Sequence, residues 1–438
     1  MTDIHDTNHR ADYSEPNLSG WDISWLIVFV IFLVGAQQLS IFFETSVAIY
    51  GRWIGVGIFV SIFWLVFLKD GLRLNVDKKW LIFFYFWVGW QIFLIIHYEP
   101  SLSEIFEDRV ARFMLMIAGI GFSAYKRSPR QALKTLNQSY FLLNLLLVLV
   151  SFLYIGKFPI FTQNRFTGIF RNPNYLSWSV ANVLLLAIPI FVHSNRIKQS
   201  NGSRIIWVTI IIMSTILIVA AKTRGAIIAI SLVVIFYLFY EGTRKLIKGL
   251  VVVLVIGGSL VLQFPDELAI VARTDMIHFN DSLSSTDLAR LTSSRSTILE
   301  HSWLELRRNP ERLFIGSGVR DVIRLDKIAR DAGWHDPIGL LHSDGIIGFV
   351  FYWSFLLALI LSAFKRAWQE KSHPPVDLWI YPTTFIWLTK IVVGSIGDSI
   401  LIIGHMDHIY FWICAGILII NSNSKNQQSI VQQQQWLK

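Results

Sequence analysis

One long polar segment, from about Phe264 to Leu341, holds most of the residue types that could do chemistry. Arginine suits phosphate because its planar guanidinium donates paired hydrogen bonds, and histidine titrates near neutral pH. The segment is rich in both, with Arg290, Arg295, Arg307, Arg308, Arg312, Arg320, Arg324, Arg330, His278, His301 and His335, and His342 follows it directly. On a membrane surface, this combination predicts a site that handles phosphate or pyrophosphate beside a titratable base.

A second polar group runs from Arg165 to Asn174, with the sequence Arg-Phe-Thr-Gly-Ile-Phe-Arg-Asn-Pro-Asn. Asn-Pro indicates a turn, and Asn172 or Asn174 can cap a helix that follows. The positive start of such a helix attracts an anion, which makes Arg165, Arg171 and Asn174 candidate ligands. The plain alternative is an ordinary helix start whose arginines reach to the membrane interface. From this group alone, the two interpretations are equally good.

A third group, Lys222-Thr-Arg224-Gly225-Ala226, separates two apolar stretches and predicts the tip of a tight hairpin. Neither stretch has residues to spare, so Arg224 must lie at or just inside the outer interface. Cations placed within a membrane are costly and by default functional. For Lys222 we prefer a side chain that snorkels to the interface, with substrate binding as the alternative.

Within the long segment, Ser293-Ser294-Arg295 begins an amphipathic stretch that runs to Asn309-Pro310. A loop, Ile315-Gly-Ser-Gly318, follows, and Trp334-His335-Asp336-Pro337 then leads into Gly345-Ile-Ile-Gly348. An isolated histidine outside a membrane is usually a solvated surface residue. His335, however, lies just before an expected helix start, where an acceptor hydroxyl could meet a donor embedded in the membrane.

The composition predicts an all-α polytopic membrane protein. Hydrophobic residues make up 53% of the 438 and charged residues only 16%, whereas a soluble domain carries roughly 25% charged residues. A membrane helix needs about 20 apolar residues. Twelve segments approach that length: 23–43, 47–68, 80–96, 110–125, 140–155, 175–192, 205–221, 225–240, 246–262, 345–364, 378–394 and 400–420.

Lysine and arginine positions set the orientation. With the N-terminus in the cytoplasm every inside loop is basic, while the outside loops near Glu44 and from His97 to Glu107 contain neither lysine nor arginine. We therefore expect both termini in the cytoplasm and the long segment on the outer side. The predicted divisions are a tail at 1–20, nine membrane helices in 21–262, an outer catalytic loop at 263–341, three helices in 342–421 and a disordered tail at 422–438.

Other features exclude several classes of protein. The single Cys414 cannot form an internal disulfide, and the N-terminal residues lack the apolar core of a cleaved signal peptide. We attribute the net charge of +9 to the basic inside loops and to contact with anionic lipids, not to nucleic-acid binding. The aspartates of the long segment are too widely spaced for an Asp-x-Asp metal motif, so we expect no metal and no other cofactor.

In their order along the chain, these motifs resemble the O-antigen ligase and polymerase superfamily. The resemblance covers about Arg165 to Trp353, and twelve helices with a large outer loop between the ninth and tenth also fit. It implies a bacterial inner-membrane glycosyltransferase that moves a glycan from an undecaprenyl pyrophosphate carrier to an acceptor hydroxyl on the periplasmic side. The implied partners are that lipid-linked oligosaccharide, an acceptor glycan or lipid A core, membrane lipids and a protein that regulates chain length.

The resemblance also implies residue roles. Arg224 and Arg295 would bind the pyrophosphate and His335 would be the catalytic histidine. We add as candidate substrate ligands Arg165, Arg171, Asn174, Lys222, Arg320 and His342. In the family the histidine is usually followed by Asn or Ser and stands about one residue farther from its glycine. His342, followed by Ser343, is therefore a rival.

Such a reaction is physically reasonable, because a pyrophosphate leaving group needs charge neutralisation more than a strong acid. Direct displacement would invert the anomeric configuration. The competing hypothesis is a flippase for lipid-linked glycans or another secondary transporter, and Lys390 within a predicted span is the residue that favours it. A pair between Lys390 and Asp398, or a carbonyl, is the plain explanation.

Overall fold

The computed structural model describes residues 23–42, 50, 51, 53–58, 60, 61, 78–98, 110–126, 128–157, 165–192, 200–242, 304, 307, 308, 310–316, 336–371, 378–397 and 405–420. These residues are almost entirely helical, and within these ranges the one β-type pairing is an isolated bridge between Leu39 and Phe170. The α-helices are α1 (Ile23–Gly35), α3 (Lys78–Tyr98), α5 (Ala111–Tyr125), α6 (Pro129–Leu153), α7 (Pro173–Val192), α8 (Asn201–Ala221), α9 (Arg224–Glu241), α14 (Pro310–Ile315), α16 (Asp336–Lys371), α17 (Tyr381–Gly397) and α18 (Met406–Leu418). Short 3₁₀ turns cover Ala36–Gln38, Ser40–Phe42 and Ile155–Lys157. The predicted all-α fold is confirmed.

Ten of the twelve predicted apolar segments overlap one of these helices; in 47–68 the described residues are helical, and 246–262 lies outside the described residues. In the described part of the chain, 4 helices are long and apolar enough to cross a membrane: Pro129–Leu153, Pro173–Val192, Asn201–Ala221 and Ser343–Gln369. Shorter apolar helices cover Arg112–Tyr125, Arg224–Ile235 and Met406–Leu418. These helices indicate a membrane protein. The number of twelve spans and their orientation stay predictions.

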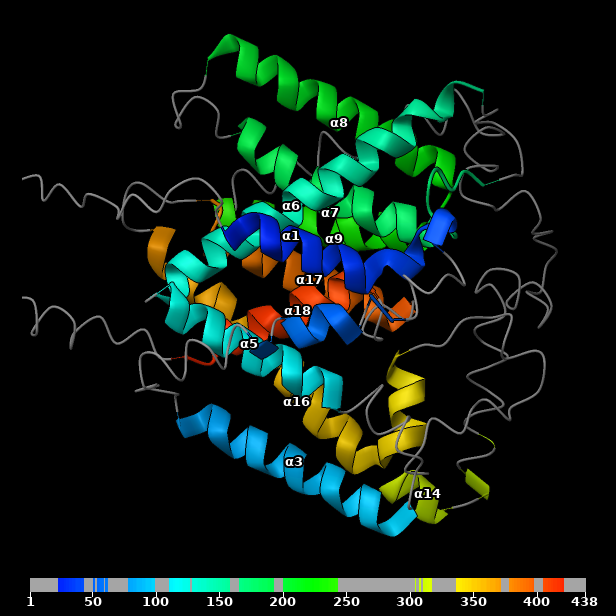
Figure 1. The fold of residues 1–438 in the computed structure, drawn as a ribbon, viewed down its shortest axis with the longest axis vertical. Helices are drawn as coiled ribbons and strands as arrows, with labels where there is room; N and C mark the ends of the chain where they lie inside the picture. The colour runs from blue at the N-terminus through cyan, green and yellow to red at the C-terminus, as the bar shows by residue number, and fades with distance from the viewer. Residues whose placement is uncertain are drawn as a thin grey trace, which may run out of the picture.

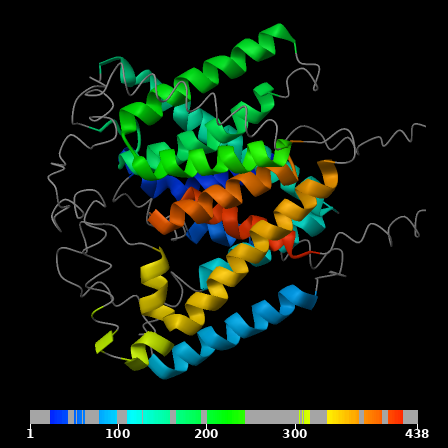
Figure 2. The same ribbon diagram turned by 180° about the vertical axis from the view of Figure 1, so that it is seen from behind.

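Helix α18 lies at the centre of the bundle, and every one of its residues is buried (Figure 1). It meets α5 backbone to backbone, because a Cβ on Gly119 would lie 2.1 Å from the Ile413 carbonyl oxygen, and one on Gly416 would lie 2.0 Å from that of Met116. Small residues let helices approach this closely in a membrane, where apolar side chains gain little by leaving lipid. Helices α8 and α3 lie at opposite edges, as both views show (Figures 1 and 2).

Proline marks several helix starts, since its missing N–H is not needed in the first turn and its φ suits a helix. Pro129, Pro173 and Pro310 are the first residues of α6, α7 and α14. Helix α14 ends at Ile315, where the expected loop begins, and Leu304, Arg307 and Arg308, the described residues of the stretch before Pro310, are helical. The amphipathic stretch expected before it lies largely outside the described residues.

Helix α16 is bent at Gly345, whose backbone (φ 65°, ψ −174°) is not helical. The short part before the bend begins at Asp336, directly after His335, as the sequence predicts. Gly316, at the end of α14, also has positive φ and packs into the bend. A Cβ on Gly316 would lie 2.3 Å from the Ser343 carbonyl oxygen, and one on Gly345 would lie 2.3 Å from that of Phe314. The two glycine motifs of the sequence therefore meet in space.

Candidate functional site

The start of α7 is built as the sequence predicts. Asn172 precedes Pro173, and its side-chain Oδ1 accepts a hydrogen bond of 2.8 Å from the backbone N–H of Asn174. Asn172 is thus the capping residue. The first backbone N–H groups of α7 lie at this start, and they carry the positive end of the helix dipole.

The hairpin tip between α8 and α9 is also confirmed. Helix α8 ends at Ala221 and α9 begins at Arg224. Lys222 closes α8 in the left-handed conformation (φ 50°, ψ 46°), which is uncommon for a residue with a side chain. Its side chain is only 1% exposed, so the snorkelling that we preferred for Lys222 is wrong. A buried lysine in a sparsely populated conformation is typical of functional sites.

Arg165 connects these two helix starts. Its Nη2 donates 2.6 Å to Asn174 Oδ1 at the start of α7 and 2.8 Å to Thr223 Oγ1 just before α9, while its Nε donates 3.0 Å to the Ala221 carbonyl. The backbone N–H of Phe166 also donates to the Ala220 carbonyl, at 3.1 Å. One guanidinium therefore fixes the ends of α7, α8 and α9 relative to one another.

The end of α1 joins the same group. The backbone N–H of Arg171 donates 2.9 Å to the Gln38 carbonyl, and that of Ser40 donates 2.9 Å to the Ile169 carbonyl. The side chain of Arg171 is exposed at this end of the bundle. Four of the predicted ligands (Arg165, Arg171, Asn174 and Lys222) thus come together with the predicted pyrophosphate-binding residue Arg224.

We call this group the helix-end site: the segment 165–175 with the tip 222–224. Arg165, Arg171, Lys222 and Arg224 supply cations, and the N-terminal ends of α7 and α9 add oriented backbone dipoles. A Cβ on Gly225 would lie 3.8 Å from the ring of Trp178, which is an ordinary contact distance, so the approach of α9 to α7 does not require the glycine. Chemically, the arrangement suits an anion with several oxygens, such as a phosphate or pyrophosphate.

A buried polar network lies beneath the helix-end site. Lys390 Nζ is 2.6 Å from Asp407 Oδ2 and 2.9 Å from Asn182 Oδ1. Asn182 Nδ2 donates 3.0 Å to Asp407 Oδ1, and Tyr140 donates its hydroxyl hydrogen to the same oxygen. Lys390 is therefore paired with Asp407, whereas Asp398, the partner that the plain explanation named, lies outside the described residues. The Lys390 ammonium lies 5.1 Å above the Trp178 ring, so this network supports the helix that carries Asn174.

A second polar group surrounds the bend in α16. Trp90 Nε1 donates 3.1 Å to the Asp344 carbonyl, Gln91 Nε2 donates 3.3 Å to Asp344 Oδ2, and the Tyr98 hydroxyl donates to the Gly316 carbonyl. Burial, and then the negative charge of Glu311, raise the pKa of Tyr98, while Arg312 lowers it. Tyr98 therefore stays a neutral donor at neutral pH. These bonds attach α3 to the glycine contact between α14 and α16.

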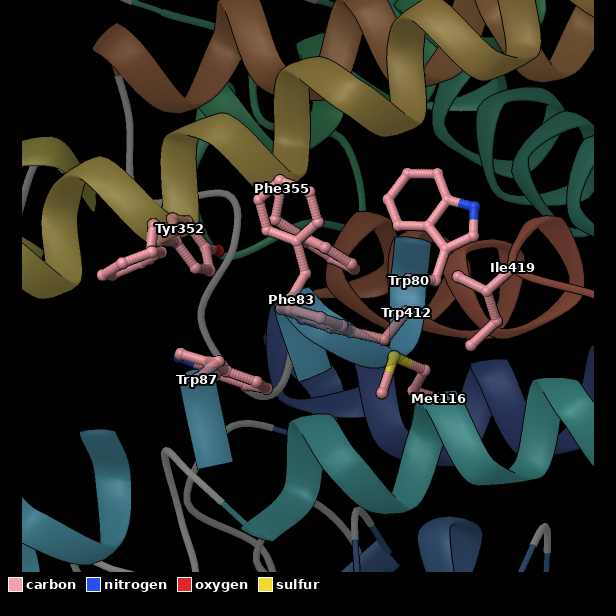
Figure 3. Close-up of a pocket in the computed structure, with 9 residues that line it drawn as sticks. Trp80, Phe83, Trp87, Met116, Tyr352, Phe355, Trp412 and Ile419 are labelled. Carbon is pink, nitrogen blue, oxygen red and sulfur yellow. The ribbon is translucent and has the colours of Figure 1, made fainter. Parts of the chain in front are cut away.

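An aromatic pocket lies between α3, α5, α16 and α18, with about 430 Å³ of space that is partly open to the surroundings. Trp80, Phe83, Trp87, Met116, Phe351, Tyr352, Phe355, Trp412 and Ile419 line it (Figure 3). The lining is almost wholly apolar. It offers a hydrocarbon chain a surface but no group for acid, base or phosphate chemistry, so it is not the candidate active site.

Other predicted residues lie elsewhere. Arg295, Arg320 and His335 fall outside the described residues, and His342 belongs to α16 but its side chain is not described. Their roles stay predictions. Among the described residues no cluster of histidine, cysteine, aspartate or glutamate could hold a metal.

Sequence reasoning missed several residues that the structure brings to this end of the bundle. Thr223 was noted only as part of the tip, yet it shares Arg165 with Asn174. Gln38, His405 and Asp407 drew no attention, although all three are at most 4% exposed. The sequence could have pointed to His405 and Asp407, because both stand within one predicted apolar span, where titratable residues are costly.

Comparison with models of known protein families gives no match, and comparison with curated proteins gives none either. The function of the chain is therefore inferred from its own geometry and from the resemblance of its motifs.

Proposed function

We propose that the chain is a membrane glycosyltransferase of the O-antigen ligase or polymerase type, which moves a glycan from undecaprenyl pyrophosphate to an acceptor hydroxyl at the periplasmic face. The observation that carries the proposal is the helix-end site, in which Arg165 joins Asn174 and Thr223 beside Lys222 and Arg224. Motifs about fifty residues apart in the chain meet there; the sequence alone predicts anion binding for the first and a functional cation for the second.

The proposed reaction breaks the bond between the first sugar's anomeric carbon and the pyrophosphate oxygen, and forms a bond from that carbon to the acceptor oxygen. Negative charge grows on the departing pyrophosphate. Arg224, Lys222 and the amide ends of α7 and α9 would stabilise this charge, a contribution that typically amounts to about 10² to 10³ in rate for a single donor. Arg165 has the different task of holding those groups in place.

The acceptor hydroxyl must lose its proton as the new bond forms. His335 remains the proposed base. His342 remains its rival, because it lies on the helix that begins directly after His335. Asp336, the first residue of α16, could orient the His335 imidazole. The contact between Gly316 and Gly345 fixes where this part of the chain enters the bundle.

The competing hypothesis of a transporter depended on Lys390. That residue already has two buried acceptors, on Asp407 and Asn182, and its side chain is 0% exposed. A charge enclosed in this way is typical of a structural element as much as of a coupling site. It does not favour transport.

Cells that lack the chain provide the test. A polymerase or ligase predicts that lipid-linked glycan accumulates on the periplasmic leaflet, with single-repeat surface chains for a polymerase and a complete loss of capped chains for a ligase. Accumulation on the cytoplasmic leaflet would contradict the proposal, because it is the result expected for a missing flippase.

A further inference from the structure

Only one of the two polar atoms of the Gln38 side-chain amide has a hydrogen-bond partner among the described residues. The residue is 3% exposed, at the end of α1, and its backbone carbonyl accepts from Arg171. Its Oε1 accepts a hydrogen bond of 3.4 Å from the backbone N–H of Met406. That bond sets the orientation of the amide, because a backbone N–H requires the oxygen and not the nitrogen.

The nitrogen of the same amide, Nε2, has no hydrogen-bond partner among the described residues. A buried donor without an acceptor destabilises a fold, and most buried polar groups are paired. Gln38 therefore presents two N–H hydrogens for which the described chain supplies no oxygen. This is the expected state of a donor that serves a bound molecule.

His405 flanks Gln38 across the start of α18. It caps the helix, with Nδ1 accepting a hydrogen bond of 3.2 Å from the backbone N–H of Asp407. Since Nδ1 is an acceptor in this bond, the neutral ring carries its hydrogen on Nε2. The ring also contacts Tyr175 edge-on, with 5.5 Å between ring centres. Two neutral donor groups and an aromatic ring thus gather at one corner.

This corner adjoins the helix-end site but differs from it in charge. Tyr175 directly follows Asn174, which binds Arg165. The acid beneath the corner, Asp407, is balanced by Lys390 at 2.6 Å. The Gln38 amide is neutral, whereas the guanidinium and ammonium groups belong to the helix-end site. An uncharged group rich in oxygen suits the corner better than a second phosphate.

We propose that Gln38 and His405 form a subsite for the first sugar of the lipid-linked donor, with the Gln38 N–H groups bound to its oxygens and the rings of His405 and Tyr175 beside it. This rests on the proposed function, because the subsite adjoins the place assigned to the pyrophosphate. Gln38 is then a specificity-determining residue for the sugar, separate from the residues that bind the carrier.

The decisive variant is Gln38→Met, which keeps the shape of the side chain and removes both donor and acceptor. The purified full chain in nanodiscs is titrated with two probes: the lipid-linked glycan that accumulates in cells lacking the chain, and bare undecaprenyl pyrophosphate. We expect the affinity for the glycan-linked probe to fall about tenfold, and that for the bare carrier to stay unchanged. Thermal stability should change little, because the variant removes an unsatisfied donor but also the acceptor of the Met406 N–H.

Gln91→Met is the matched control. Gln91 is another buried glutamine, but its Nε2 already donates to Asp344. This variant should lower thermal stability and leave both affinities unchanged. Gln38→Glu, which keeps an acceptor for Met406 and replaces the N–H donors with a carboxyl group, provides a second variant and should reproduce the selective loss.

Three results would overturn the inference. If Gln38→Met unfolds more easily and binds both probes normally, the amide is a structural group bridged by water. If the substitution lowers the affinity for both probes equally, Gln38 acts on the pyrophosphate and not on the sugar. If the wild-type chain binds neither probe, the proposed function fails as well, and the wild-type titration alone identifies that case.

Discussion

Lys390 Nζ lies 2.6 Å from Asp407 Oδ2, and the two side chains are 0% and 1% exposed. The pair joins α17 to α18, and Asn182 brings α7 into the same network. Because α7 carries Asn174 at its start, the network anchors the helix on which the helix-end site depends.

Removing one partner of the Lys390–Asp407 pair should destabilise the fold more than replacing both partners with apolar residues. Asp407→Asn leaves a buried ammonium without its counter-charge, and we expect it to lower the free energy of unfolding by about 3 to 5 kcal/mol. Lys390→Met combined with Asp407→Leu should cost clearly less and should retain glycan transfer. Equilibrium unfolding in mixed micelles measures the first quantity. A double variant that unfolds as easily as Asp407→Asn would show that the charges themselves stabilise the bundle.

The glycine contact at the bend of α16 predicts a steep penalty for one methyl group. Gly316→Ala places a Cβ 2.3 Å from the Ser343 carbonyl oxygen at φ 89°, and such backbone strain alone costs about 1 to 3 kcal/mol. Gly89→Ala in α3 is the control, because a Cβ there has nothing within 4 Å. The midpoint temperatures of thermal unfolding of the two variants test this prediction. Equal stability would mean that α14 does not enter the bend as described.

The bridge made by Arg165 should appear as coupling between distant residues. Arg165→Met and Asn174→Ala remove the two sides of one hydrogen bond, which is worth about 1.5 to 3 kcal/mol when one partner is charged. A double-mutant cycle on the free energy of unfolding should therefore show the double variant to be less destabilised than the sum of the singles. Strict additivity would indicate that the guanidinium does not hold α7 against the hairpin tip.

Orientation in the membrane can be tested with exposed positions of the bundle. In a Cys414→Ser background, a cysteine at Gly156, where a Cβ has nothing within 4 Å, should react with an impermeant maleimide added outside intact cells. A cysteine at Asn201, exposed at the start of α8, should react only after the cells are opened. The reverse pattern would place the helix-end site in the cytoplasm.

Local patterns in the sequence predict most of the helices and the two helix ends of the site. Apolar length gives the helices, Asn172-Pro173 gives the start of α7, and the three polar residues before Gly225 give the hairpin tip. Each of these depends on neighbouring residues in the chain, which is why a single sequence is enough.

Contacts between helices could not be predicted in the same way. Arg165 and Thr223 are brought together by the packing of α7 on α8 and α9, which no local pattern specifies. Asp398 seemed the natural partner of Lys390 because it is near in sequence, and it lies outside the described residues; the partner that the structure describes is Asp407, on the next helix. Gln38 is an ordinary polar residue until its burial and its unused nitrogen are known.

The most direct test of the proposed function is transfer by the purified protein. The chain in nanodiscs is mixed with an acceptor fraction and the lipid-linked glycan that accumulates in cells lacking it, and the release of undecaprenyl pyrophosphate is followed together with the glycan product. We predict that both appear at equal rates, that Arg224→Lys lowers the rate about a hundredfold because lysine lacks the planar fork, and that Arg204→Lys, near the other end of α8, does not. No release by the wild-type protein, or an Arg224→Lys protein as fast as wild type, would contradict the account.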